Sequence, residues 1–180
     1  MATSILVKSV ASSIAACAAE YVFASKIGLI AAAGPAGIPG AFGCVIAVNC
    51  VASTFTLLGL SFKVGMARSE ANVQYPTMYA TGTDAKSIKF NCVQRGHQQA
   101  LETYTSFVVM SLIGGLSHPM FVSVAGITWI IGRWKWAEGY ATGDPNARYT
   151  SVWSRFIWYS LFAVATASLS TAFRCTTGLF

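Results

Sequence analysis

The chain has 180 residues, of which 54% are hydrophobic and only 10% are charged, and its mean hydropathy is +0.56. Ordinary soluble domains carry about 25% charged residues, so this composition excludes a water-soluble globule and favours lipid as the main solvent. A spanning helix needs about 20 residues, so about four or five spans fill the chain and exclude a separate soluble catalytic domain. Any function must lie in the membrane or at its surface.

The charge is strongly basic, with 12 Lys and Arg against 6 Asp and Glu and a net charge of +6. In a soluble protein this excess would suggest nucleic acid. Here the basic residues lie in loops between apolar segments, where an anionic leaflet attracts them, so we expect a lipid bilayer and no nucleic acid as partner. The five cysteines form no CxxC pair, which predicts neither a disulfide framework nor a metal site.

Residues 1–40 form an N-terminal extension with two interpretations. Residues 9–19 suit the apolar core of a signal peptide, or they belong to a retained extra helix, amphipathic and lying in the membrane interface. We favour the retained helix. A mitochondrial transit peptide should be rich in Arg, and the extension has none. The sequence GPAGIPG at 34–40 separates the extension from residues 41–180, since closely spaced Pro and Gly oppose a continuous helix.

Two uncharged segments of residues 41–180 predict one spanning helix each, over about Ala41–Phe62 and over Phe156–Phe173. Between them, the uncharged run Thr103–Gly132 contains the turn signal GGLSHP. This run is shorter than the about 40 residues that two spans need. Two further helices must therefore borrow residues from polar flanks, so we expect one from near 92–97 to Leu116 and one over Pro119–Tyr140.

The resulting topology places the basic loops 63–98 and 133–155 on one side of the bilayer and the turn at Ser117 on the other. The positive-inside rule makes the basic side cytosolic. The sequence therefore predicts an all-α, integral membrane four-helix bundle with an additional N-terminal helical extension.

A polar stripe follows the second predicted helix. Asn91, Arg95, Gln99 and Glu102 are spaced 4, 4 and 3 residues apart, which places them on one helix face. The length shortfall brings at least Gln99 and Glu102 into the membrane zone, where ionisable groups are costly and usually mark function. Alternatively, Arg95 and Glu102 reach the interface or pair with a neighbouring helix.

A second stripe ends the third predicted helix on the same side of the bilayer. Arg133, Trp136 and Tyr140 are spaced 3 and 4 residues apart, and Arg148 follows in GDPNAR. For Trp136 and Tyr140 the alternative is an aromatic interface belt. We expect the arginines, Glu102 and the tyrosine to converge at one pocket. Such a pocket suits an anionic ligand that also carries an amine, because Arg holds carboxylates by paired, charge-assisted hydrogen bonds.

Several common catalytic motifs are missing from the sequence, which has no GxSxG, P-loop or HExxH. His97 and His118 fall at opposite ends of their helices, so they cannot share a metal, and we interpret both as structural. The site residues therefore predict no metal.

Three segments, VQYPTMYA, FNCVQRGHQQALETY and IGRWKWAEGYATGDPNAR, resemble the membrane-associated proteins in eicosanoid and glutathione metabolism (MAPEG), most closely the type-3 microsomal glutathione S-transferases. The resemblance covers roughly Gly43 to Arg174. It implies a four-helix subunit in a homotrimer, with glutathione as co-substrate bound between subunits at the cytosolic side. It also implies the endoplasmic reticulum or a mitochondrial membrane as the location.

The resemblance assigns roles to individual residues. Arg95 matches the arginine that holds a glutathione carboxylate, Glu102 matches the glutamate that takes its amino group, and Arg148 matches the arginine proposed to activate the thiol. The other implied binding residues are Arg68, Gln99, Trp136 and Tyr140. The sequence departs from the family pattern at four positions: Ser69 and Glu70 replace bases, Gln99 replaces an asparagine and Trp136 replaces a tyrosine.

The implied activity is that of a glutathione-dependent transferase or peroxidase, which activates the glutathione thiolate for attack on lipophilic electrophiles or lipid hydroperoxides. The alternative is a non-catalytic scaffold of the same fold or an accessory subunit that binds other membrane subunits. The extension, Trp136 and Ser69 favour this alternative. A transporter or channel is a third possibility, but no charged residue lies centrally in the predicted spans.

Overall fold

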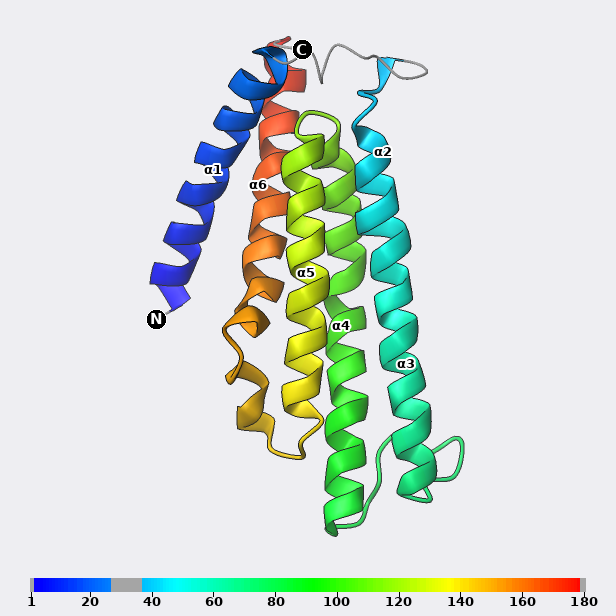
Figure 1. Ribbon diagram of the computed structural model, residues 1–180. Coiled ribbons are helices and arrows are strands. Elements are labelled where there is room, and N and C mark those ends of the chain that lie inside the picture. Colours follow the sequence, from blue (N-terminus) through cyan, green and yellow to red (C-terminus); the bar gives the residue numbers. More distant parts are fainter. Residues whose placement is uncertain (1, 27–36, 179–180) are drawn as a thin grey trace.

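The computed structural model describes residues 2–26 and 37–178, and all regular structure in these ranges is helical (Figure 1). In chain order the elements are α1 (Ala2–Lys26), α2 (Phe42–Val45), the π-helical η2 (Ile46–Ala52), α3 (Ser53–Glu70), α4 (Ala85–Gly115), α5 (Pro119–Tyr140), the 3-10 turns η3 (Pro145–Tyr149) and η4 (Val152–Arg155), and α6 (Phe156–Thr177). Of these, α2, η2 and α3 form one continuous long helix.

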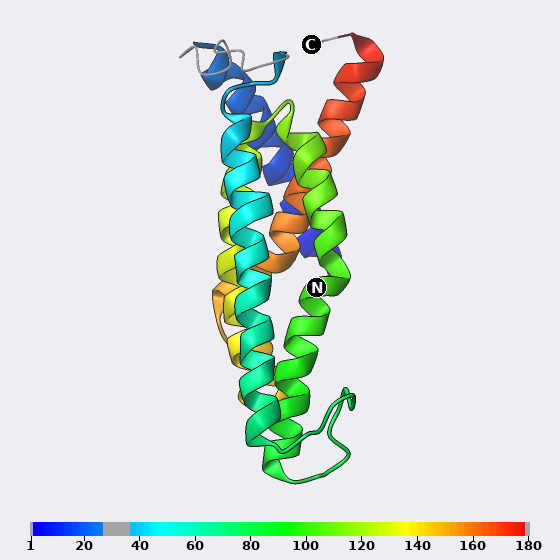
Figure 2. The same ribbon diagram turned by 90° about the vertical axis from the view of Figure 1, so that its right-hand side faces the viewer.

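The helices stand side by side as an elongated bundle in which α4, α5 and α6 pack against one another and α3 packs on α4 (Figures 1 and 2). The α3–α4 loop and the segment containing η3 and η4 lie at one end, and the α4–α5 turn lies at the other (Figure 1). This confirms that the two basic loops share one end of the bundle. Their cytosolic orientation stays a prediction.

Two helical stretches of the described residues are long and apolar enough to cross a membrane, Phe42–Glu70 and Val152–Thr177. They correspond to the first and fourth predicted spans. With 31 and 22 residues, α4 and α5 also have the length that a span needs. Both helices carry polar stripes, so their composition alone does not identify them as spans. Their place in the bundle supports a membrane-spanning position, which stays a prediction.

The start of α4 differs from the prediction. The helix begins at Ala85 instead of near 92–97, because Asp84 caps it. The Asp84 carboxylate accepts hydrogen bonds from the backbone amides of Lys86 and Ser87 at 3.0 and 3.1 Å, which satisfies two donors of the first turn. The polar segment that was expected to be a loop therefore forms two more helical turns. In contrast, α5 has the predicted bounds.

The N-terminal extension contains a helix, as predicted, and this helix docks on the bundle. α1 packs along α6 (Figure 1), and the Glu20 carboxylate accepts hydrogen bonds from the amides of Met120 and Phe121 at 2.7 and 3.0 Å. The N-cap residue of α5, His118, makes no capping bond with its own side chain. Glu20 therefore caps α5 from another helix. An interfacial position of α1 stays a prediction, and part of the GPAGIPG sequence lies outside the described residues.

A buried amide fixes the π-helical segment against two neighbouring helices. Asn49 is fully buried, and its Nδ2 donates to the Ser111 hydroxyl of α4 at 2.9 Å and to the Val122 carbonyl of α5 at 3.1 Å. Below this contact, the rings of Phe107 and Trp129 stack with centroids 4.5 Å apart. Hydrogen bonds between helices help to hold a bundle together in a membrane, where burial of apolar side chains does not drive helices to associate. The Asn49 amide therefore helps to fix the register between α4 and α5, which carry the site.

Candidate functional site

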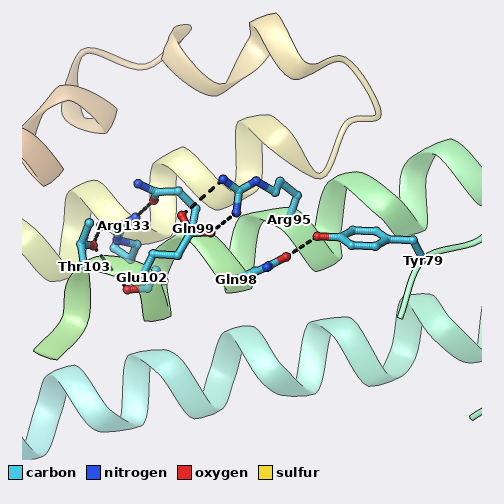
Figure 3. A network of polar contacts seen from close by, with 8 residues as sticks. Tyr79, Arg95, Gln98, Gln99, Glu102, Thr103 and Arg133 are labelled. Atoms are coloured by element: carbon cyan, nitrogen blue, oxygen red, sulfur yellow. Dashed lines mark hydrogen bonds and ion pairs between the residues drawn. The ribbon is translucent and has the colours of Figure 1, made fainter. Parts of the chain in front are cut away.

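The central feature of the site is an ion pair along α4 (Figure 3). Arg95 and Glu102 are seven residues apart, so two helical turns bring them to the same face. The Arg95 Nη1 lies 2.6 Å from Glu102 Oε1, and Nη2 lies 3.3 Å from Oε2. The two side chains are 39% and 47% exposed. The two side chains therefore neutralise each other and remain partly accessible.

Behind this pair, α5 contributes a buried cation. Arg133 is only 1% exposed, and its guanidinium donates to the Gln99 side-chain oxygen and, at 3.0 Å, to the Thr103 hydroxyl (Figure 3). Its guanidinium carbon lies 5.1 Å from the centre of the Trp129 ring, a cation–π contact. Within the described residues, no carboxylate lies at ion-pair distance from Arg133. A buried charge with neutral partners is costly, so this position favours an anion.

Gln99 contacts α5 in this structure. Its side-chain oxygen accepts a hydrogen bond from Arg133, and a binding role for Gln99 stays a prediction. One residue earlier, Gln98 accepts a hydrogen bond from the Tyr79 hydroxyl of the α3–α4 loop (Figure 3). The polar residues of α4 therefore contact α5 through Gln99 and the α3–α4 loop through Gln98.

A second group of residues joins the end of α5 to η3. Trp136 is buried and stacks on Tyr140 with ring centroids 5.0 Å apart. The Arg148 guanidinium carbon lies 5.8 Å from the Tyr140 ring centre and 5.2 Å from that of Tyr149, and Arg148 donates to the Pro145 carbonyl. The structure thus brings Trp136, Tyr140 and Arg148 together. Among the described residues, no hydrogen bond or ion pair joins this group to the Arg95–Glu102 pair, but Tyr140 lies close enough to Arg95 for an electrostatic interaction.

Gly139 allows η3 to approach α5 this closely. A Cβ at Gly139 would come within 3.0 Å of the Ala147 carbonyl carbon and of the Arg148 Cα, and closer still to the Ala147 carbonyl oxygen. Any side chain here would therefore push the η3 backbone away. The absence of a side chain at this position places Arg148 over Tyr140.

Arg68 and Asn91 are used to hold the α3–α4 loop. The Arg68 guanidinium donates to the carbonyls of Thr77 at 2.6 Å and Val73 at 3.4 Å, and it lies over the Tyr75 and Phe90 rings. The Asn91 amide exchanges two hydrogen bonds with the backbone of Ala80. The structure therefore places Arg68 in a structural contact, away from the Arg95–Glu102 pair, and a binding role for Arg68 stays a prediction.

Asp84, outside the spans, is held as a carboxylate at the base of this loop. The Ser87 hydroxyl and the first amides of α4 donate to it and lower the pKa of Asp84 below its usual range. The acid therefore remains charged at the positive end of the α4 dipole.

Three residues in the network were not predicted as site residues: Thr103, Gln98 and Tyr79. Arg133 was expected in the pocket as part of the second stripe, but the sequence did not indicate its partners. Thr103 lies one helical turn after Gln99, which is a partial signal. Its contact with Arg133 depends on how α5 packs on α4, so neither position predicts the other.

The bundle combines apolar helices with an Arg–Glu pair and a buried arginine, and ionisable groups among apolar membrane helices usually mark a functional site. The profile of the MAPEG family matches residues 46–172. The chain belongs to the MAPEG family. This family of membrane proteins uses glutathione, and it includes glutathione transferases and peroxidases as well as non-catalytic members.

Proposed function

We propose that this chain is a glutathione-dependent transferase or peroxidase of the membrane, similar to type-3 microsomal glutathione S-transferases. The observation that carries the proposal is the exposed Arg95–Glu102 pair beside the buried Arg133. Glutathione carries two carboxylates and one ammonium. Arg133 and Arg95 can each attract one carboxylate, and Glu102 can attract the ammonium. A bundle with a purely structural role does not require these three charged side chains.

Binding would proceed by exchange of partners. In the free chain each member of the Arg95–Glu102 pair neutralises the other. A ligand with a carboxylate beside an ammonium can take over both ends, with its carboxylate on Arg95 and its ammonium on Glu102. Arg133, held by Gln99 and Thr103, attracts a second carboxylate. Since Arg95 and Glu102 are half exposed, a neighbouring subunit of a homotrimer would complete the site.

Arg148 supports the chemical step. A thiol such as that of glutathione titrates near about 8.5, and its thiolate is the nucleophile. A guanidinium beside the sulfur stabilises the thiolate without a general base. The sulfur then forms a bond to an electrophilic carbon, and the leaving group departs with the electron pair. With a lipid hydroperoxide, two glutathione molecules are oxidised to the disulfide, and the hydroperoxide is reduced to an alcohol and water.

The bilayer would supply the second substrate. The helices around the site are apolar on their outer faces, so a lipophilic electrophile or hydroperoxide can reach the sulfur laterally. The proposed location is the membrane of the endoplasmic reticulum or of a mitochondrion.

The test is glutathione turnover by the purified protein in detergent, with Arg148→Ala as the variant. If Arg148 stabilises only the ionised sulfur, turnover should fall about a hundred- to thousand-fold, while glutathione affinity changes little. The ultraviolet absorbance of the bound thiolate at neutral pH should also disappear. Arg155→Ala is the matched control, since it removes the same charge from the neighbouring turn η4. Equal turnover in wild type and Arg148→Ala would leave Arg148 as a surface charge.

The second candidate is a non-catalytic scaffold or accessory subunit. The observation that favours it is α1, which adds a docked helix outside the matched segment 46–172. A protein that binds glutathione without any thiolate absorbance at neutral pH, and that co-purifies with other membrane subunits, would support this candidate over the enzyme.

A further inference from the structure

Tyr149 contacts one arginine of the candidate site and lies near another. It follows Arg148 in η3, and the Arg148 guanidinium carbon lies 5.2 Å from its ring centre. Tyr149 is also close enough to the buried Arg133 of α5 for an electrostatic interaction. This tyrosine therefore links the Arg133 network to the turn that carries Arg148. The role proposed above for glutathione binding and activation does not use it.

The Tyr149 hydroxyl makes one hydrogen bond, and the direction of this bond is fixed. Trp158 of α6 donates its Nε1–H to the Tyr149 oxygen, with 3.0 Å between the two atoms. An indole nitrogen can only donate, whereas a phenol can both donate and accept. The Tyr149 oxygen is therefore the acceptor, and the bond leaves its own proton unused. Within residues 2–26 and 37–178, no acceptor lies within hydrogen-bond distance of this proton.

The packing of α6 on α5 explains why Trp158 reaches this tyrosine. A Cβ at Gly132 would lie 3.0 Å from the Ile157 amide nitrogen, so the absence of a side chain allows the start of α6 to lie directly against α5. Gly132 precedes Arg133, and Ile157 precedes Trp158. This close approach therefore brings Trp158 and Arg133 to the same level of the bundle. Tyr149 is only partly buried there, so a bound molecule can reach its proton.

Reduction of a hydroperoxide needs a proton that the glutathione thiolate no longer carries. The thiolate attacks the outer oxygen of the hydroperoxide. A sulfur–oxygen bond forms, the oxygen–oxygen bond breaks, and an alkoxide leaves with the bonding electron pair. Because an alkoxide is a strong base, a positioned proton donor speeds its departure. A chloride that leaves from an aryl chloride takes no proton, so the two classes of electrophile make different demands on the site.

Resting on the glutathione-dependent function proposed above, we propose that Tyr149 is the catalytic acid of the peroxidase reaction and donates its phenolic proton to the leaving alkoxide. The products of this step are an alcohol, the sulfenic acid of glutathione and a Tyr149 phenolate. The guanidinium groups of Arg148 and Arg133 stabilise the phenolate by their charge, and Trp158 stabilises it by its hydrogen bond.

A second glutathione completes the reaction. Its thiol returns a proton to Tyr149, and the resulting thiolate attacks the sulfur of the sulfenic acid. A disulfide forms, and hydroxide leaves and combines with the proton that the first thiol released when it ionised. Two glutathione molecules and one hydroperoxide thus give one disulfide, one alcohol and one water, and Tyr149 is regenerated.

The test compares two second substrates in the purified full chain in detergent, linoleic acid hydroperoxide and chlorodinitrobenzene. The measured quantity is the ratio of kcat/KM for the hydroperoxide to kcat/KM for the aryl chloride, with glutathione at saturation. Tyr149→Phe should lower this ratio about a hundredfold, because general acid catalysis contributes about 10²–10⁴-fold to the rate. The ratio corrects for any loss of folded protein, since both reactions need the same bound thiolate.

Two further variants test the position of the proton. Trp158→Phe removes the hydrogen bond that places the Tyr149 oxygen and should lower the ratio up to about tenfold. Tyr159→Phe is the matched control, because it removes a hydroxyl from the next residue of α6, whose ring contacts Phe156 outside this network. Its ratio should equal that of the wild type.

The possible results separate this inference from the proposed function. An unchanged ratio in Tyr149→Phe, or the same loss in Tyr159→Phe, would overturn the role of Tyr149 and leave the glutathione-dependent activity standing. A wild-type protein that reacts with the aryl chloride alone would also overturn it. If the wild type consumes neither substrate, the proposed function itself fails.

Discussion

Arg133 is a buried guanidinium that is held by neutral groups alone in the described structure. The amide oxygen of Gln99, the hydroxyl of Thr103 and the face of Trp129 recover part of the hydration that burial removes. They do not neutralise the charge. A bundle that needed Arg133 only for packing would be as stable with an apolar side chain of similar length, because uncompensated buried charges are costly.

Arg133→Met tests this distinction. We expect a thermal midpoint equal to or above that of the wild type, because the buried charge is removed and its volume is nearly kept. Glutathione affinity should fall about tenfold or more, because one carboxylate loses its charged partner. Calorimetry in detergent measures the affinity, and thermal unfolding measures the stability. Lower stability with intact affinity would show that Arg133 serves the fold and not the ligand.

Glu102→Gln tests the other end of the ligand. The amide keeps the size of the carboxylate but removes the charge that pairs with Arg95 or with an ammonium, so glutathione affinity should fall about tenfold or more. Glu138→Gln is the matched control, because Glu138 forms an exposed ion pair with Lys135 at 2.9 Å on α5, outside the network. Calorimetry should detect a loss in the first variant only. The same affinity in both variants would remove Glu102 from the site.

At this scale, the sequence predicts which residues share a helix face. Helical period places Arg95 and Glu102 on one face, but only the structure shows that they pair with each other. The sequence does not predict that the Gln99 oxygen belongs to Arg133, because that bond joins two helices whose register is set by packing. Arg68 shows a second limit. Its partners are backbone carbonyls of the α3–α4 loop, and the side chains in the sequence do not indicate which carbonyls a loop presents.

Among the elements, η3 depends most on one backbone contact. Gly139→Ala would add a Cβ 3.0 Å from the Arg148 Cα, and η3 would shift to relieve the clash. If Arg148 activates the thiol, a displacement of about 1 Å should lower turnover about a hundredfold. Glutathione affinity should change little, because Arg95 and Glu102 are on α4. Turnover and calorimetry separate the two effects.

Gly65→Ala provides the control for this variant. Gly65 lies in α3, and a Cβ there meets nothing within 4 Å, so the change should leave turnover intact and slightly stabilise the helix. If Gly139→Ala behaves in the same way as Gly65→Ala, the close approach of η3 has no bearing on catalysis.

The cap of α4 gives stability a defined dependence on pH. Hydrogen bonds from Ser87 and the first amides lower the pKa of Asp84. The stabilisation is therefore fully present above the unfolded value of about 3.9 and is lost as the pH falls through the lower folded value. Asp84→Asn keeps an acceptor but does not titrate. Its thermal midpoint should lie below that of the wild type at neutral pH, and the difference should vanish well below about pH 4. A difference that stays constant across this range would refute the cap as the source.

The sequence predicts the elements well where apolar runs and turn signals coincide. Pro119 and Tyr140 bound α5 as expected, because Pro suits the first turn of a helix. In contrast, the sequence places the start of α4 too late. The residues from Ala85 onward are mostly polar, so they show no apolar periodicity that would indicate a helix. Only the hydrogen bonds of Asp84 show that it is the cap of α4.

For the whole molecule, the clustering of basic loops at one end predicts the orientation in the membrane. In a variant without native cysteines, Thr83→Cys should react with a membrane-impermeant thiol label from the cytosolic side. Leu116→Cys, exposed near the α4–α5 turn at the other end, should react only from the opposite side. Labelling of sealed vesicles of known orientation measures this. Labelling with the sides reversed would invert the topology.

The bond between Glu20 and the start of α5 also constrains the order of assembly. The two partners are 100 residues apart in the chain, so α1 leaves the ribosome long before Met120 is synthesised. The first turn of α5 therefore lacks the Glu20 carboxylate as its acceptor until α1 packs along α6. A protease that removed α1 during insertion would leave the amides of Met120 and Phe121 without Glu20. The cap of α5 therefore forms late and depends on α1.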